Sequence, residues 1–230
     1  MSIILMRLET LAEGVIVKRP SKQCKTPYVA DVMLHETNLE ILGHSPSLGC
    51  CGLADNGASV LVSDVTHNNK KQKNVCSHRV DIALFKEGDR EILIGINPKI
   101  AENIAEEAIK NNCIQGLEEV RSFAREIKVM NSRFDFAGID ETGKPFILEI
   151  KNVPLADYVD VPKKERRKYE HEIINKKFDE KISYFPDGYR KNSTDVVSPR
   201  ALKHIQELEE IAKKGTVRAI LCFVIQRNDV

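Results

Sequence analysis

Two carboxylates and an amine lie close together in the segment from Ser132 to Lys151, which reads SRFDFAGIDETGKPFILEIK. Asp135 stands before a turn-forming stretch, and Glu149 and Lys151 follow it. Carboxylates held at short range repel each other, which raises the pKa of one of them unless a cation lies between them. The segment therefore contains the residue types that bind a hard divalent ion.

The elements that must position these side chains are two strands joined by a tight turn. Residues 133–139 and 146–151 are rich in apolar side chains, and the stretch between them has the composition of a hairpin loop. If Asp140 pairs with Lys144 across a three-residue loop, the same register sets Asp135 opposite Glu149. Because side chains alternate along a strand, Glu149 and Lys151 share one face, and Asp135 lies on it.

The ions that suit this set are Mg²⁺ and Mn²⁺, which are held by one or two carboxylates together with substrate phosphate oxygens. Such an ion lowers the pKa of a bound water, while a neighbouring lysine orients the water or neutralises the phosphate. This is the chemistry of phosphodiester cleavage. An ordinary amphipathic strand with a solvated Glu149 and Lys151 stays open as the alternative, because 30% of the residues are charged and the spacing also arises by chance.

The composition limits the class of protein. A chain of 230 residues builds one or two domains. The net charge of +1 and the pI near 7.6 indicate that any nucleic-acid surface is local. No apolar run approaches the roughly 18 residues of a membrane span, and Arg7 cuts the opening apolar run too short for a signal peptide. We expect a soluble, cytoplasmic protein without a membrane partner, and the six scattered cysteines favour reduced thiols over a zinc site.

The N-terminal part, residues 1–86, is typical of a small β-barrel. Five short apolar runs are separated by turn-forming residues, which predicts a five-stranded, OB-like barrel. The runs are Gly14–Lys18, Tyr28–Leu34, Leu39–Gly43, Ser59–Val65 and Val80–Phe85.

Two loops of this part carry groups suited to a phosphate backbone. His44–Gly52 is rich in glycine and serine, which offer backbone N–H and hydroxyl groups. His67–Lys73 is basic, with Lys70, Lys71 and Lys73 as candidate nucleic-acid contacts. Ordinary solvated loops are the alternative for both. With such contacts, residues 1–86 would form a nucleic-acid-binding domain.

The remainder, residues 87–230, has the element order αβββαβ of a mixed-sheet domain, so the expected fold class is α+β. After a first strand, the pattern predicts a helix, a strand, the hairpin, a second helix and a last strand. The predicted strands are Glu91–Ile96, Phe123–Met130, the two strands of the hairpin and Val217–Ile225. The predicted helices are Ala101–Asn112 and Pro199–Lys213, and the second carries Leu202, Ile205, Leu208 and Ile211 on its apolar face. The last strand is nearly all apolar, which is typical of a central strand covered on both faces.

A basic stretch follows the hairpin. Residues 163–177 contain seven Lys or Arg against three Glu. A flap of this charge over a phosphate-binding cleft would make sequence-independent contacts. The candidates are Lys163, Lys164, Arg166 and Arg167. A surface insertion with solvated charges is the alternative.

Five motifs occur in one order along the chain, namely Ser132–Phe136, Leu148–Val153, Phe185–Asp187, Lys203–Leu208 and Phe223–Asp229. In this order they resemble the sugar fermentation stimulation protein (SfsA) family, and the resemblance runs from about Leu11 to the end. Two departures concern the loop at His44, which has serine where the family has asparagine, and the end at Val230, beyond which family members continue.

The resemblance implies an OB-like domain followed by a restriction-endonuclease-like core of the PD-(D/E)xK type. It also implies nucleic-acid binding and nuclease activity that depends on Mg²⁺ or Mn²⁺. In this sequence Asp135 and Glu149 would be metal ligands, Lys151 the catalytic lysine and the Ile150 carbonyl a further ligand.

Two further acids enter through the same resemblance. Glu107 and Glu126 are candidate outer carboxylates, for which surface ion pairs are the alternative, and Arg133 is a candidate nucleic-acid contact. A DNA-binding regulator of sugar metabolism that keeps the fold without cleaving is the rival function, because fold does not guarantee activity. The sequence leaves open whether the substrate is DNA or RNA, single- or double-stranded, and which oligomer forms, a homodimer being one option.

Overall fold

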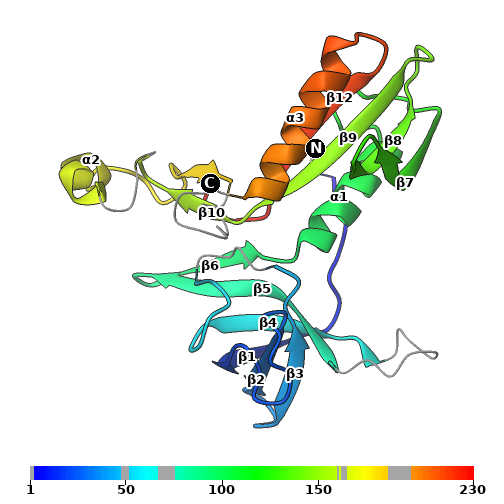
Figure 1. Ribbon diagram of the computed structural model, residues 1–230. Helices are drawn as coiled ribbons and strands as arrows, with labels where there is room; N and C mark the ends of the chain where they lie inside the picture. The colour runs from blue at the N-terminus through cyan, green and yellow to red at the C-terminus, as the bar shows by residue number, and fades with distance from the viewer. Residues whose placement is uncertain (1–2, 48–51, 67–75, 160, 162–164, 186–197) are drawn as a thin grey trace. The chain divides into compact units, whose positions relative to one another are not determined.

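A computed structural model of the chain describes residues 3–47, 52–66, 76–159, 161, 165–185 and 198–230 (Figure 1). The chain divides into two compact units, each assembled from segments that are distant in the sequence. The first, here called the β unit, comprises Glu9–Asn97, Asn152–Pro186 and Ile225–Val230, and the second, here called the α/β unit, comprises Met1–Leu8, Pro98–Lys151 and Asp187–Val224. These discontinuous units differ from a division into continuous domains at residue 87.

The β unit is built on one six-stranded sheet. Its strands are β1 (Leu11–Lys18), β2 (Val29–Leu34), β3 (Glu40–His44), β4 (Ser59–Asp64), β5 (His78–Glu87) and β6 (Arg90–Gly95), in the order β3-β2-β1-β4-β5-β6. Neighbours pair antiparallel, and β3 also pairs with β5 in parallel. The five strands predicted for this part are therefore present, and their pairings form a ring.

The strand β6 belongs to this sheet, although the sequence analysis assigned it to the second domain. It pairs with β5 from Glu87 opposite Arg90 onward, across a turn in which Gly88 has φ +60°. Such a conformation favours glycine. The short turn makes β5 and β6 a hairpin, so β6 continues the first sheet.

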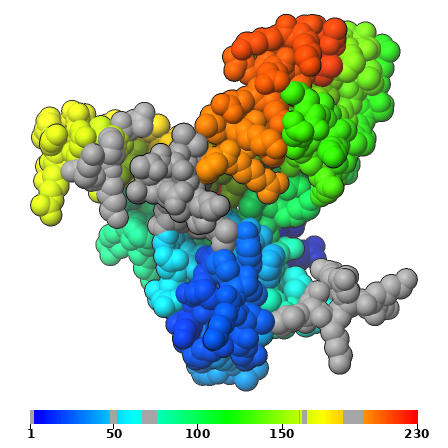
Figure 2. All heavy atoms as spheres, in the orientation of Figure 1, coloured from blue at the N-terminus to red at the C-terminus, as the bar shows by residue number. Residues whose placement is uncertain are grey.

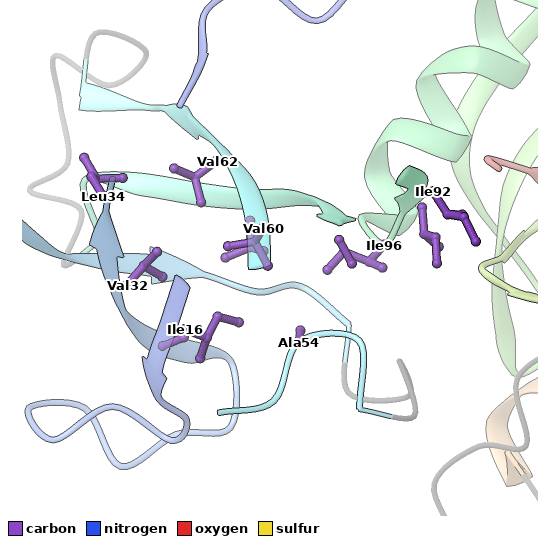
Figure 3. Packing of buried hydrophobic residues seen from close by; sticks show 12 residues of the cluster. Ile16, Val32, Leu34, Ala54, Val60, Val62, Ile92 and Ile96 are labelled. Atoms are coloured by element: carbon purple, nitrogen blue, oxygen red, sulfur yellow. The ribbon is translucent and has the colours of Figure 1, made fainter. Parts of the chain in front are cut away.

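Period-two alternation builds the core of the β unit. Alternate residues of the strands point inward and exclude water from the space inside the sheet. The buried cluster contains Ile16, Ala30, Val32, Leu34, Ala54, Val60, Val62, Val80, Ala83, Ile92, Ile94 and Ile96 (Figure 3).

Segments from the middle and the end of the chain complete the β unit. The strands β10 (Leu155–Asp157) and β11 (Ile182–Tyr184) pair antiparallel, and the short helices η2 (Arg166–Tyr169) and α2 (Glu170–Ile173) lie between them in the sequence. The Gly95 N–H donates to the Gln226 carbonyl at 2.8 Å. The Gln226 amide donates to Asn152 Oδ1 at 2.8 Å, and the Asn152 amide donates to the Gly95 carbonyl at 2.9 Å. These three bonds attach both late segments to β6.

The α/β unit is a four-stranded sheet with a helix on each face. Its elements are α1 (Pro98–Lys110), β7 (Ser122–Val129), β8 (Ser132–Ile139), β9 (Pro145–Val153), α3 (Pro199–Lys213) and β12 (Arg218–Ile225), and the sheet order is β12-β9-β8-β7. Within this unit the element order is αβββαβ, as the sequence predicts. Over the described part of the chain, no helix has the length and apolar character needed to cross a membrane.

Alternate side chains of β9 pack against different helices. Leu148 and Ile150 are buried with residues of α1, whereas Ile147 is buried with Leu208 and Ile211 of α3. Neighbouring side chains on a strand point to opposite faces, so one strand serves both cores. Both faces of β9 are thus protected from water.

The strand β12 is an edge strand, not the central strand that its apolar sequence suggested. It stands first in the sheet order, and Phe223 is 51% exposed. Five of its side chains contribute to the clusters on the two faces, among them Ile220 on one face and Leu221 on the other. Because both faces of β12 are covered, its sequence is nearly all apolar. The pattern of apolar residues does not distinguish an edge strand from a central strand.

The buried face of α3 is rotated from the predicted one. His204, Glu207, Leu208 and Ile211 are buried, whereas Ile205 is 42% exposed. The outer side of the helix forms part of the surface (Figure 2). The apolar pattern misjudged the face because two of its inner positions carry polar residues.

The turn of the β8–β9 hairpin is fixed by Asp140. Its N–H donates to the Lys144 carbonyl at 3.0 Å, which gives the three-residue loop on which the register depends. Its carboxylate accepts from the N–H groups of Thr142 and Lys144 at 3.0 and 2.9 Å and from Arg218 at 2.9 Å. The Thr142 hydroxyl and these donors hold the pKa of Asp140 well below its usual range.

Replacing Asp140 by alanine is expected to destabilise the protein. Since the folded-state pKa of this carboxyl is depressed, its contribution to the free energy of unfolding is present above the usual pKa of about 3.9 and is lost as the pH falls through the folded-state value. Asp140→Ala should therefore lower the urea midpoint clearly at pH 7 and progressively less in acid. Lys144→Ala, at an exposed position of the same turn, is the matched control, and equal midpoints for the two variants at pH 7 would contradict this account.

Candidate active site

The hairpin brings the two predicted acids together. The strands β8 and β9 pair from Ile139 opposite Pro145 to Phe136 opposite Leu148, so Asp135 and Glu149 come directly after the last pair, and the charge of Glu149 acts on Asp135. The Ile150 N–H donates to Asp135 Oδ2 at 2.7 Å. A backbone group of β9 thus orients the carboxylate of β8.

The strand β8 is irregular at Asp135. Phe136 packs in the cluster that contains α1, whereas Phe134 packs in the cluster that contains α3. Residues two apart face the same side of a regular strand, so the alternation breaks between them. Glu126, between the β7 residues that pair with these two phenylalanines, has φ +55°. The acid pair lies at this break in the sheet.

Glu149 is the buried centre of the site. Its Oε1 accepts from the Lys151 ammonium and from His204, whose Nδ1 lies at 2.5 Å. Its Oε2 is buried and has no hydrogen-bond partner among the residues that the structure describes. Because an unpaired buried carboxylate oxygen is costly, this atom is suited to accept a cation.

The environment of Asp135 favours its protonated form. Burial raises the pKa of Asp135 to about 6, and the negative charge of Glu149 adds to the rise. The Ile150 N–H opposes the rise, Glu102 of α1 adds to it, and the Lys151 ammonium opposes it. A cation beside Asp135 would offset the burial and the repulsion that raise its pKa.

The residues present fit a hard divalent ion. Asp135 and Glu149 supply carboxylate oxygens, one of which lacks a donor. The Ile150 carbonyl lies beside them, since Lys151 Nζ, which binds Glu149, is also 3.4 Å from that oxygen. Oxygen donors of this kind suit Mg²⁺ and Mn²⁺, which often take only one or two carboxylates from the protein. Within the described residues, no three His, Cys, Asp or Glu side chains form a metal cluster.

His204 is a site residue that the sequence analysis missed. It is buried on α3, and its ring centroid is 5.7 Å from that of Phe134. Its burial can be inferred from the sequence, because His204 precedes Leu208 by four residues and Ile211 by seven, which places all three on the inner face of the helix. This spacing identifies a buried histidine, but it does not identify Glu149, 55 residues away, as its partner.

The two candidate outer acids lie in exposed ion pairs. Glu107 binds a lysine of the next helical turn at 2.8 Å, and Glu126 pairs with Arg133 at 3.3 Å. The acid of α1 whose charge acts on Asp135 is Glu102. In the structure, Glu107 and Glu126 thus make the surface ion pairs that were the alternative to a role as outer carboxylates.

The candidate nucleic-acid contacts are described only in part. Arg133 is exposed, and so are Arg166, which pairs with Asp157 at 2.8 Å, and Arg167. Arg166 and Arg167 belong to the β unit. Lys70, Lys71, Lys73, Lys163 and Lys164 lie outside the described residues.

The fold and the site define an α+β protein with an acid pair and a lysine on one hairpin. The chain belongs to the sugar fermentation stimulation protein (SfsA) family, because residues 99–230 match the family model described as the sugar fermentation stimulation protein RE domain. The predicted family is therefore confirmed.

Individual relatives agree with this assignment. The sugar fermentation stimulation protein homolog of Clostridium perfringens (strain 13 / Type A) is 29% identical over 221 residues, which cover 96% of this chain and 76% of the relative. The homolog of Clostridium novyi (strain NT) is 30% identical over 175 residues, covering 74% and 70%. The structure of Pyrococcus furiosus SfsA in complex with Ca²⁺ matches with a TM-score of 0.70 at 18% identity, covering 100% of this chain and 78% of that one, and shows the shared fold.

The raised pKa of Asp135 predicts a pH-dependent stability in metal-free protein. Between the usual value near 3.9 and the folded-state value of about 6, the folded state binds the extra proton, so the free energy of unfolding falls as the pH rises, by on the order of 2 kcal/mol. Asp135→Asn removes this titration. In EDTA, the variant should lose less stability than the wild type between pH 4 and 7, as measured by urea unfolding.

The control for this experiment is Glu209→Gln, which removes an exposed carboxylate of the same unit. Its pH dependence should follow that of the wild type. If the free energy of unfolding depends on pH in the same way for Asp135→Asn and the wild type, the pKa of Asp135 is not raised in the folded protein.

Proposed function

We propose that this protein is a metal-dependent nuclease that hydrolyses phosphodiester bonds of DNA or RNA with Mg²⁺ or Mn²⁺. The single observation that carries the proposal is the buried Oε2 of Glu149, which has no partner among the described residues and belongs to the same site as Asp135 and Lys151. A buried carboxylate with an unpaired oxygen, next to a half-buried second carboxylate, can hold a cation, whereas the solvated carboxylates of a surface strand do not require one.

Each residue of the site has a role in this proposal. Asp135, Glu149 and the Ile150 carbonyl would hold the ion, which supplies Lewis acidity and a water of lowered pKa when bound. Lys151 would neutralise charge that develops on the phosphate as water attacks phosphorus and the bond to the leaving oxygen breaks. The solved Pyrococcus furiosus relative, which is in complex with Ca²⁺, supports a hard divalent ion in this family.

The β unit is proposed to hold the nucleic acid. The ring of pairings among β1 to β5 supports an OB-like barrel, and such barrels bind oligonucleotides. Arg167 is exposed on η2 of the same unit and would contribute a phosphate contact. The α/β unit, with its sheet between two helices, is proposed to be nuclease-like.

Lys151→Ala tests the assignment of the lysine. Because Lys151 acts on charge in the transition state, the variant should lose at least about a hundredfold in cleavage rate while its affinity for the nucleic acid changes little. Single- and double-stranded DNA and RNA are assayed with Mg²⁺, with Mn²⁺ and with EDTA. Lys213→Ala, which removes an exposed lysine of α3 paired with Glu209 at 2.6 Å, is the matched control. Cleavage in EDTA, or full activity of Lys151→Ala, would exclude this site.

One observation favours a second candidate function. Glu149 Oε1 already accepts from Lys151 and His204, so part of the acid charge is balanced by the chain itself. In a DNA-binding regulator without nuclease activity, the contacts from Lys151 and His204 would stabilise Glu149 without a metal ion. Such a protein would keep the ion pair as a structural element of the hairpin.

Calorimetric titration with Mn²⁺ separates the two functions. If the site binds metal, Asp135→Asn and Glu149→Gln should each weaken Mn²⁺ binding by at least about tenfold, because each removes a ligand charge. Glu209→Gln, which removes an exposed carboxylate of α3, is the control and should bind as the wild type does. Binding that is independent of Asp135 and Glu149 would favour the regulator.

A further inference from the structure

Two hydrogen-bond donors converge on one oxygen of Glu149. The Lys151 ammonium comes from the same strand, two residues along, and His204 comes from α3. Both contact Oε1, while Oε2 has no partner in the described part of the chain. The carboxylate is therefore held at Oε1, while Oε2 is buried without a donor among the described residues.

The His204 ring is fixed more firmly than the lysine. It is buried against Phe134 with a centroid distance of 5.7 Å, and α3 is anchored by Leu208 and Ile211 in the same apolar cluster. The lysine has a flexible four-carbon stem, whereas the imidazole has two rotatable bonds and a ring confined by packing. Of the two donors, His204 is the one whose position the fold determines.

We propose that His204 is a positioning residue, which holds Glu149 Oε1 so that Oε2 faces the metal and Lys151 is released to contact the phosphate. This inference rests on the proposed function. If Lys151 were the sole donor, its departure toward the substrate would leave Oε1 of a buried carboxylate without a hydrogen bond, which is costly. With His204 in place, one oxygen stays bonded throughout.

The bond specifies one nitrogen of the ring. Glu149 Oε1 already accepts from Lys151 and can only accept in its carboxylate form, so Nδ1 carries the hydrogen. An asparagine side chain places an amide nitrogen where Nδ1 lies, whereas a glutamine places it where Nε2 lies. His204→Asn and His204→Gln are thus a matched pair of similar polarity that differ in the position of the donor.

The experiment is a Mn²⁺ titration by calorimetry of the wild type and both variants, with urea unfolding in EDTA to verify that each is folded. Partners that orient metal ligands typically contribute ten- to hundredfold to metal affinity. We expect His204→Gln to weaken Mn²⁺ binding by at least about tenfold and His204→Asn to stay within about threefold of the wild type. Ile205→Ala, next to His204 but on the exposed side of α3, should bind as the wild type does.

The kinetic signature of positioning is a loss in kcat without a matching change in KM, since the substrate contacts are untouched. Equal Mn²⁺ affinity of His204→Gln and the wild type would overturn the inference and leave the proposed nuclease intact. Wild-type protein that binds no Mn²⁺ would remove the proposed metal site and this inference with it. Mn²⁺ binding that depends on His204 in a protein without cleavage activity would support the inference and refute the nuclease.

Discussion

The burial of the Glu149 carboxylate is the constraint on which the α/β unit depends. A carboxylate removed from water must be met by donors or cations. The unit meets this requirement from two sides, with Lys151 on the same strand and His204 on the helix that covers it. The inner face of α3 therefore carries a histidine where packing alone would place an apolar residue. The buried carboxylate of Glu149 thus accounts for a polar residue on a helix 55 residues further along the chain.

The acid site could be predicted from the sequence because its information is local. The turn residues around Asp140, the apolar alternation of β8 and β9 and the parity of Glu149 and Lys151 all lie within one short segment, and the hairpin follows from them. His204 could not be assigned in this way, because its partner lies on another element. The break at Asp135 was equally hidden, since a side chain that changes face leaves no trace in residue types.

Strand membership was harder to predict than strand existence. The sequence indicated the bounds of β6 and β12 to within one residue, yet it assigned β6 to the wrong sheet and β12 to a central position. Hydrophobic pattern reports which faces of a strand are covered and not which neighbours it pairs with. The family motif near the C-terminus illustrates the same limit, because Gln226 bonds to Gly95 and Asn152 rather than to any group of the acid site.

At two of its crossings the chain passes between its two units inside a continuous strand. In β9 the crossing falls between Lys151 and Asn152, and in β12 it falls between Val224 and Ile225. A crossing inside a strand leaves no flexible linker at that point, so each of these strands contributes residues to both units. The acid hairpin is therefore covalently continuous, through β9, with the segment that completes the β unit.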